Sequence, residues 1–204
     1  KELDKIAYDV ITSHGAIPSF LNYNGYPASI CASINEVVIH GIPSSKQILK
    51  DGDIISIDIG ANYKGYHGDC ARTWPCGNVK SDRLKLIEVT EQSFFEGLKY
   101  AHPGNRLSDI SHAIEMYAKK FNYGVVRDFT GHGVGSKLHE DPAVPNYGKE
   151  GMGPVLRKGM TLAIEPMINM GTYKVKILAD GWTTITSDHS PSAHYENSIV
   201  ITDN

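Results

Sequence analysis

Residues 49–58, LKDGDIISID, decide how we interpret the fold of this 204-residue chain. They resemble residues 156–165, LRKGMTLAIE, which lie 107 positions later. Each segment has a leucine, a basic residue, a glycine and then a β-rich run that ends in a carboxylate. A basic residue and a glycine often precede a strand, so ten residues alone do not establish a duplication. The repeat predicts two related halves that deliver Asp58 and Glu165 to a shared centre.

The residues around the first of these segments predict a hairpin. Residues 54–61 and 66–74 are β-rich, and the four residues 62–65, NYKG, are typical of a turn. If Tyr63 and Lys64 form a two-residue loop, Asp58 stands directly opposite Asp69, with Cβ atoms about 5 Å apart. Two carboxylates so close repel each other unless a cation lies between them. We therefore expect a divalent metal at this hairpin.

Three other parts of the chain are predicted to be helical. Apolar residues recur at helical spacing between Leu3 and Ile11 and between Leu107 and Phe121, and Ser81 is a plausible N-cap for a helix before Pro103. The remaining segments are short apolar runs broken by glycine and proline. Strands, then helices, then strands predict an α+β fold. We expect one catalytic domain over residues 1–204, with a boundary between its halves near 104–125.

Composition limits the classes of function. Apolar residues make up 41% of the chain and charged residues 21%, with a net charge of −3. This describes a globular protein without the basic surface that reads nucleic acid, and no apolar run approaches the ~20 residues of a membrane span. Three cysteines without a C-x-x-C pair favour a reducing cytoplasm. The first residue is Lys1, from which we expect an N-terminus that is truncated or processed.

Further acids and one histidine extend the metal hypothesis. Glu165 and Glu196 each border a short apolar strand, and His132 lies between glycines in residues 130–135, TGHGVG. Four carboxylates and one imidazole balance the charge of two divalent cations, and oxygen and nitrogen donors suit manganese, iron, cobalt or zinc. A pair of such ions activates water in aminopeptidase chemistry. The simpler alternative is that a strand acid pairs with an arginine, for which Arg72 is the nearest candidate.

Two other catalytic patterns fail on inspection. His139 and Glu140 begin an H-E-x-x-H pattern, but residue 143 is alanine. Cys31 would need a histidine and an orienting group to act as a nucleophile, so a thiol that lines a core or a pocket is the better interpretation.

Several motifs together resemble the type I methionine aminopeptidases. They are residues 33–43, SINEVVIHGIP, the pair His67-x-Asp69, residues 131–135 with His139, residues 163–166, AIEP, and residues 194–197, HYEN. They follow the family's order over nearly the whole chain. The resemblance implies the pseudo-twofold pita-bread fold, in which a central antiparallel sheet is backed by helices. It also implies removal of the initiator methionine when the second residue is small.

The resemblance assigns roles to individual residues. Two divalent metals would be held by Asp58, Asp69, His132, Glu165 and Glu196, with Glu165 as general base. His139 would contact the scissile carbonyl or its oxyanion, and His40 the peptide nitrogen. The methionine side chain would lie among Tyr23, Tyr26, Cys31, Leu138 and Trp182. Main-chain oxygens of Asn35, Val37 and Ser192 would bind sodium or potassium.

The resemblance has further implications and some departures. The partners would be peptides and nascent chains that begin with methionine, at the ribosome among other places, and the chain would act as a monomer. Leu138 stands where bacterial members often have phenylalanine, and Asn24 where histidine is common. Either change alters the rim of the expected pocket. A proline-directed enzyme such as aminopeptidase P or prolidase, and a metal-free binding module of the same fold, are the alternatives.

Overall fold

The computed structural model describes residues 1–203. Its helices are α1 (Glu2–Ser13), α2 (Ser81–Leu98) and α3 (Leu107–Lys119), with one 3-10 turn, η1 (Tyr23–Gly25). Its strands are β1 (Ile17–Pro18), β2 (Ile30–Ile34), β3 (Val37–Ile39), β4 (Ile54–Tyr63), β5 (Tyr66–Pro75), β6 (Gly124–Val125), β7 (Gly131–Gly133), β8 (Glu140–Val144), β9 (Thr161–Ile164), β10 (Met167–Asn169), β11 (Val175–Ile177), β12 (Thr184–Thr186), β13 (Ser192–His194) and β14 (Glu196–Val200). The predicted α+β class is confirmed.

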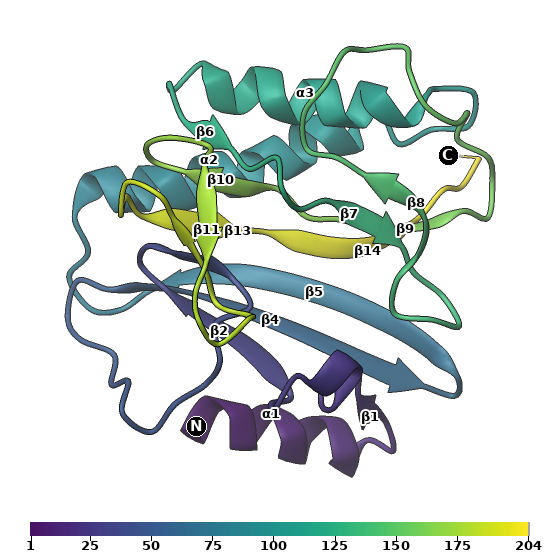
Figure 1. Cartoon of the computed structure of the whole chain (residues 1–204). Helices are drawn as coiled ribbons and strands as arrows, with labels where there is room; N and C mark the ends of the chain where they lie inside the picture. The colour runs from purple at the N-terminus through teal and green to yellow at the C-terminus, as the bar shows by residue number, and fades with distance from the viewer. Residues whose placement is uncertain (204) are drawn as a thin grey trace.

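One antiparallel sheet organises the molecule. Its strand order is β1-β4-β5-β14-β9-β7-β8, and β2 also pairs with β4. The order β2-β4-β5 is therefore mirrored by β7-β9-β14 about the junction of β5 and β14 (Figure 1). The two similar segments that opened the sequence analysis form β4 and β9, at equivalent places on the two sides of this junction. This arrangement is the predicted pseudo-twofold sheet.

The hairpin of β4 and β5 has a register that differs from the expected one. Tyr63 pairs with Tyr66, so the loop is Lys64 and Gly65, and both have positive φ angles of 53° and 88°. Asp58 consequently lies opposite Ala71, not opposite Asp69. The loop moves by one residue because glycine accepts the second left-handed position that this turn requires. The shift changes the partner by two positions, so Asp58 and Asp69 still point to the same face.

Two helices cover the other face of the sheet. Helices α2 and α3 pack on β9 and β14 through a buried apolar cluster that includes Phe94, Ile110, Ile114 and Leu162. At the start of α3 the Arg106 N–H donates to the carboxylate of Asp109, which caps the first turn. Helix α2 begins one residue earlier than predicted, because Lys80 is at the N-cap position and Ser81 lies inside the first turn.

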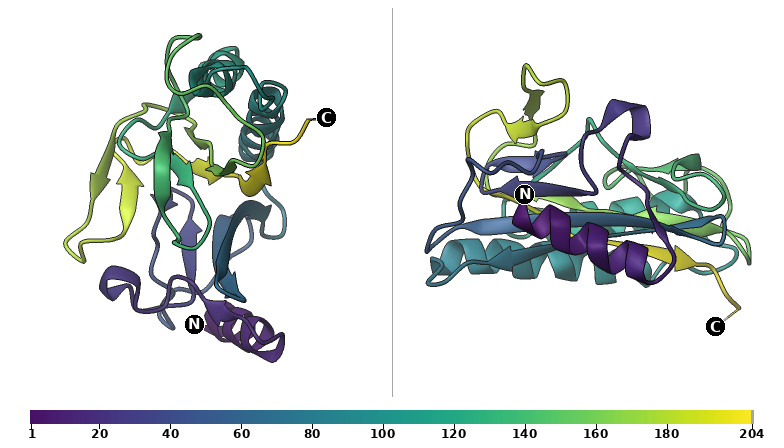
Figure 2. Two further views of the ribbon diagram at one scale, coloured as in Figure 1. Left: turned by 90° about the vertical axis from the view of Figure 1, so that its right-hand side faces the viewer. Right: turned by 90° about the horizontal axis from the view of Figure 1, so that it is seen from below.

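Two small sheets, ordered β13-β10-β6 and β11-β12-β3, complete the fold. The first packs against α2 and α3, because Val125, Ile168 and Ala193 share a buried cluster with Leu86 and Ala118. Figure 2 shows the long strands between the helices on one side and the β11–β12 hairpin on the other. Within residues 1–203, no helix combines the length and the apolar composition needed to cross a bilayer.

Candidate metal centre and adjoining pocket

Strand register places the predicted acids in one row across the sheet. Cys31 lies opposite Asp58, Asp58 opposite Ala71, and Ala71 opposite Glu196. Directly paired residues share a face, so these four side chains project together. Ala71 is fully buried between the two acids, and its methyl group leaves space there. The row joins a carboxylate of the first half to one of the second half.

A second row lies two residues along the same strands. Asp69 lies opposite Gly60, and the Asp69 N–H donates to the Ser198 hydroxyl at 2.8 Å. Ser198 pairs with Ala163, which pairs with His132. Small residues again separate the functional groups. Glu165 follows Ala163 by two residues and therefore returns to the first row.

Two glycines hold His132 in place. A Cβ atom on Gly131 would come within 2.3 Å of the Ala163 carbonyl oxygen, and one on Gly133 would come within 2.3 Å of the Asp141 carbonyl oxygen. Only glycine permits this close packing between β8 and β9. The imidazole Nδ1 lies 2.8 Å from the Gly133 carbonyl oxygen, to which it donates in the Nδ1–H tautomer. In this tautomer Nε2 carries a free lone pair that can bind a metal ion. It lies 3.5 Å from Glu165 Oε1 and 3.9 Å from Asp69 Oδ2.

The electrostatics of this centre favour a bound cation over four ionised carboxylates alone. Burial, and after it the charges of neighbouring acids, raises the pKa of Asp58, Glu165 and Glu196 well above the usual carboxylate range. Burial raises the pKa of Asp69 to about 7. Four ionised carboxylates so close are unfavourable without positive charge.

The donor atoms fit a metal ion by their positions as well. Asp58 Oδ1 and Glu196 Oε1 are buried without a hydrogen-bond partner among the described residues. The donor atoms form two groups, and within each group all atoms lie within 4.8 Å of one another. One group is Asp69, His132 and Glu196, and the other is Asp58, His194 and Glu196. Glu196 belongs to both. Hard oxygen and imidazole nitrogen donors match divalent first-row metals.

An apolar pocket opens directly onto this centre. The cavity measures about 290 Å³. Its lining contains the five predicted metal ligands, His40, His139 and the five residues predicted to hold a methionine side chain, together with Phe20 and Asn24. Phe20, Tyr26, Cys31 and Leu138 form one buried cluster, against which Trp182 packs. Phe20, which no sequence motif indicated, places its ring over Gly60 beside the acids.

The Cys31 thiol is part of the pocket wall. Burial and the charge of Asp58 raise its pKa well above the usual range. The thiol is therefore protonated at neutral pH and unsuited to nucleophilic attack. The interpretation as a pocket-lining thiol is consistent with this environment.

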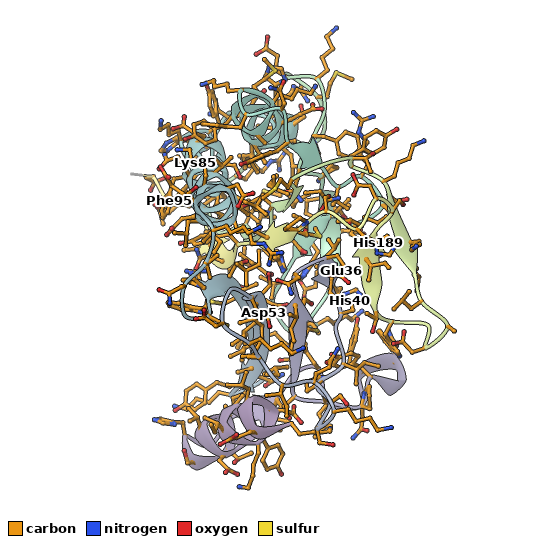
Figure 3. All side chains as sticks on the ribbon, turned by 90° about the vertical axis from the view of Figure 1, so that its left-hand side faces the viewer. Glu36, His40, Asp53, Lys85, Phe95 and His189 are labelled. Atoms are coloured by element: carbon orange, nitrogen blue, oxygen red, sulfur yellow. The ribbon has the colours of Figure 1, made fainter. Side chains whose placement is uncertain are left out.

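Two histidines lie at the mouth of the cavity. Desolvation lowers the pKa of His40 to about 4, and its ring packs edge-on against Phe129 and Trp182 at 5.6 and 6.1 Å. Figure 3 places His40 near the β11–β12 hairpin, whereas Lys85 and Phe95 lie on α2 beyond the sheet. Desolvation, and after it the nearby rings of His132 and His40, lowers the pKa of His139 to about 4.

His139 also joins the pocket rim to the centre. Its Nδ1 lies 2.7 Å from the Tyr23 hydroxyl, and its ring centroid lies 4.2 Å from that of His132. Both His40 and His139 are neutral at pH 7. Each carries one N–H that can donate to a carbonyl oxygen or an oxyanion.

Arg72 and His194 lie in positions that the sequence did not predict. Arg72 donates to the Glu196 carbonyl oxygen and to Asn197 Oδ1 and stacks on the Tyr195 ring at 3.9 Å. It makes no ion pair with Asp58 within residues 1–203, so the arginine-pairing alternative is wrong. His194, which the sequence analysis quoted without a role, has its Nε2 3.8 Å from Glu165 Oε2 and 3.9 Å from Glu196 Oε2. Its position two residues before Glu196 is the signal that could have identified it.

The three residues expected to bind a monovalent cation come from two adjoining segments. The Ser192 N–H donates to the Asn35 carbonyl oxygen at 2.8 Å, and Val37 pairs with Ile185 in the neighbouring small sheet. Asn35 has a φ angle of 53°, and its side chain bonds Asp53 and Arg83. The cation itself stays a prediction.

Known proteins resemble the chain over its whole length. Residues 1–203 match metallopeptidase family M24. The methionine aminopeptidase of Clostridium acetobutylicum is 57% identical over 203 residues, which cover 100% of this chain and 81% of that protein. The crystal structure of methionine aminopeptidase from Thermotoga maritima superposes with a TM-score of 0.98 at 43% identity, over 100% of this chain and 82% of that one. The prolidase from Pyrococcus furiosus has a TM-score of 0.67 at 25% identity, over 86% of this chain and 46% of that one. The resemblance and the pita-bread fold predicted from the sequence are thereby confirmed, and the chain belongs to metallopeptidase family M24.

Proposed function

We propose that this chain is a metal-dependent aminopeptidase that removes the N-terminal methionine of peptides and nascent proteins when the second residue is small. One observation carries the proposal: a single cavity joins a floor of four acids and an imidazole to an apolar wall. The relatives named above bear out the aminopeptidase class. Their much higher structural similarity favours methionine removal over the proline-directed alternative.

The five donors at the floor would hold two divalent ions. These donors are Asp58, Asp69, His132, Glu165 and Glu196, which all line the cavity, and Glu196 belongs to both groups of donor atoms. Manganese, iron, cobalt and zinc all suit this set of donors. When bound, such ions polarise a carbonyl group and make water acidic enough to attack it at neutral pH.

Three residues would move or hold protons around the scissile bond. Glu165 would take the proton of the attacking water, because its carboxylate faces the centre of the donor set. His139 would donate an N–H to the oxyanion while Tyr23 holds its other ring nitrogen. His40 would contact the peptide nitrogen that becomes the leaving amine. Both histidines act as neutral donors because desolvation lowers each pKa to about 4.

The apolar wall would hold the methionine side chain. The wall is formed by Tyr23, Tyr26, Cys31, Leu138 and Trp182. Its aromatic edges and its thiol match a polarisable thioether. Phe20 would complete the wall. Leu138 and Asn24 would set the shape of the rim, and with it the tolerance for the second residue.

Several finer expectations belong to the same proposal. Residues 1–204 would form one catalytic unit whose halves meet between residues 104 and 125. Sodium or potassium would bind main-chain oxygens of Asn35, Val37 and Ser192. The enzyme would act as a monomer in the cytoplasm, on nascent chains at the ribosome among other substrates.

The first test is release of free methionine from a Met-Ala-Ser peptide. Chelator-stripped protein is titrated with Mn²⁺ under anaerobic conditions, and an Xaa-Pro peptide serves as the comparison substrate. We expect saturable release from Met-Ala-Ser that depends on Mn²⁺. Activity on Xaa-Pro alone would identify a proline-directed enzyme, and no tight binding of metal would identify a binding module.

A second test concerns the general base. In Glu165→Gln the side chain keeps its size but cannot accept the proton, so we expect kcat to fall by about 10²-fold or more. Turnover equal to that of the unmodified enzyme would contradict this role for Glu165.

A further inference from the structure

The imidazole of His194 lies in the metal centre without a role in the reaction described above. The residue is 2% exposed, and its Nε2 has no hydrogen-bond partner among residues 1–203. A buried polar atom without a partner destabilises the folded protein. Nε2 lies almost equally far from two carboxylate oxygens, 3.8 Å from Glu165 Oε2 and 3.9 Å from Glu196 Oε2. This position between two acids requires an explanation beyond packing.

The backbone of His194 is held from two sides. Its N–H donates to Thr73 Oγ1 at 2.9 Å, and the Thr73 hydroxyl lies 2.8 Å from the His194 carbonyl oxygen. His194 also pairs with Met167 across β13 and β10. Contacts with β5 and β10 therefore fix the direction in which the side chain leaves the strand, toward the acids.

The carboxylate of Glu165 lies between two imidazoles. Its Oε1 faces His132 Nε2 at 3.5 Å, and its Oε2 faces His194 Nε2 at 3.8 Å. One oxygen is thus directed toward a metal donor and the other toward His194. A carboxylate offers about four lone-pair directions, so Oε2 can accept an N–H and still receive a proton from water.

We propose that His194 is a positioning residue whose Nε2–H donates to the carboxylates of Glu165 and Glu196 and fixes their rotation around the metal ions. The proposal rests on the proposed function, because it names a further residue for the same site. Groups that orient ligating side chains typically contribute 10–100-fold to metal affinity or activity.

Direct ligation by His194 is the competing assignment. One of its ring nitrogens lies within 4.8 Å of donor atoms of Asp58 and Glu196. Two observations favour positioning. The two carboxylate oxygens that face His194 Nε2, at 3.8 and 3.9 Å, belong to two different acids, as expected for a shared N–H donor. The four carboxylates also balance the charge of two divalent ions without a further ligand.

Three substitutions separate the assignments. In His194→Gln the amide nitrogen takes the approximate place of Nε2 and can donate, whereas in His194→Asn it takes the place of Nδ1. His194→Leu removes the donor while keeping an apolar volume. For each metal-free protein, Mn²⁺ affinity and stoichiometry are measured by anaerobic calorimetry, and kcat and KM are measured with Met-Ala-Ser. Thermal unfolding of the metal-free forms reports whether each variant folds.

We expect His194→Gln to match the unmodified protein within about 3-fold in both Mn²⁺ affinity and kcat. Asn and Leu should each weaken Mn²⁺ binding and lower kcat by about 10–100-fold, with KM at saturating Mn²⁺ changed by no more than about 2-fold. Asn tests the same position if the Leu variant does not fold. Mn²⁺ binding by Leu or Asn equal to that of the unmodified protein would overturn the proposal. Loss of one bound ion in all three variants, Gln included, would replace positioning by ligation.

These readouts keep the two proposals apart. If the unmodified protein binds Mn²⁺ in the expected His194-dependent way but releases no methionine, the proposed function fails and the positioning role survives. If methionine is released and the variants bind Mn²⁺ normally, only the positioning role fails.

Discussion

Each side of the central sheet places two acids at the candidate metal centre, but the two sides do so with different connections between strands. On one side a single hairpin, β4 and β5, carries Asp58 and Asp69 with a two-residue loop between its strands. On the other side Glu165 follows β9 and Glu196 begins β14, and the chain between them forms β10 to β13. The first pair of acids depends on local pairing, whereas the second depends on strands that meet only in the finished fold.

The outer strands differ in chemistry as well. Strand β2 places Cys31 opposite Asp58, and β7 places His132 opposite Ala163. The thiol joins the apolar wall and the imidazole joins the acids. A sheet of mirrored order thus has an apolar pocket at one end of its functional face and an imidazole donor at the other. The scissile bond would lie where the two meet.

Glu196 is the acid that both sides share, so its loss should have the largest effect. It pairs with Ala71 of the hairpin and belongs to both candidate donor groups. For Glu196→Gln we expect kcat/KM with Met-Ala-Ser to fall by about 10³-fold or more, or ~4 kcal/mol of transition-state stabilisation. Bound Mn²⁺ should fall in parallel. Glu88→Gln, on the exposed surface of α2, is the control and should change neither quantity.

The register between the two sides can be tested without touching a ligand. Ala71 is fully buried between Asp58 and Glu196. Ala71→Leu would fill the space for a metal ion, so we expect Mn²⁺ affinity to fall by about 10²-fold, with ~1–3 kcal/mol of overpacking cost in unfolding. Ala71→Gly keeps the space and should bind Mn²⁺ nearly normally. Normal calorimetric titration of the leucine variant would show that residue 71 does not face the metals.

A substitution in the apolar pocket should change KM for the peptide without changing the affinity for Mn²⁺. Leu138 is 2% exposed and packs with Tyr26 and Cys31. In Leu138→Ala we expect KM for Met-Ala-Ser to rise about 10-fold, because the thioether loses apolar contacts that contribute ~1–2 kcal/mol to binding. The affinity for Mn²⁺ should stay unchanged. A peptide that begins with norleucine has the same shape without sulfur and serves as the matched substrate. Equal KM values for wild type and variant would remove Leu138 from the pocket.

The smallest effect is the pH dependence of the metal-free protein. Native Asp58, Glu165 and Glu196 keep their protons well above the usual carboxylate range, whereas the unfolded chain has lost these protons by about pH 5. The native state thus binds more protons, and its stability falls as pH rises through the native pKa values. Between pH 7 and 8.5, above the titration of the histidines, we expect the free energy of unfolding to fall by about 1 kcal/mol per pH unit.

Metal should reverse this behaviour. Bound Mn²⁺ favours the ionised carboxylates, so the loaded protein should show a nearly flat stability between pH 7 and 8.5 in urea titrations. A metal-free protein whose stability rises over the same interval would contradict the raised carboxylate pKa values.

Local pattern was enough for part of the molecule. The α+β class, the long helices and the β4–β5 hairpin follow from local patterns in segments of ten residues or more. The hairpin register did not, because Tyr63-Lys64 and Lys64-Gly65 are both plausible loops, and the choice depends on which residue adopts a positive φ angle. The error preserved the face of each acid, so the metal prediction survived it.

On the second side, local pattern indicated Glu165, Glu196 and His132 as candidates but did not predict how their strands pair. Strands β10 to β13 have three residues each, too few to show a period. Their pairing with one another brings His194 beside Glu165, a contact between residues that no local pattern relates. Phe20 was missed for the same reason, because it reaches the centre only through the close approach of its loop to Gly60.

Because the Cys31 thiol is protonated, chemical modification of the pocket should depend on how well a reagent fits it. Reagents that depend on a free thiolate should react slowly there, since the sulfur is buried and its pKa is raised. A ligand shaped like methionine would instead rest against that sulfur. An electrophile carried by such a ligand gains reactivity from residence time, not from thiol acidity. Selective labelling of this enzyme would therefore be governed by fit to the pocket, and exposed Cys70 would report the background reaction.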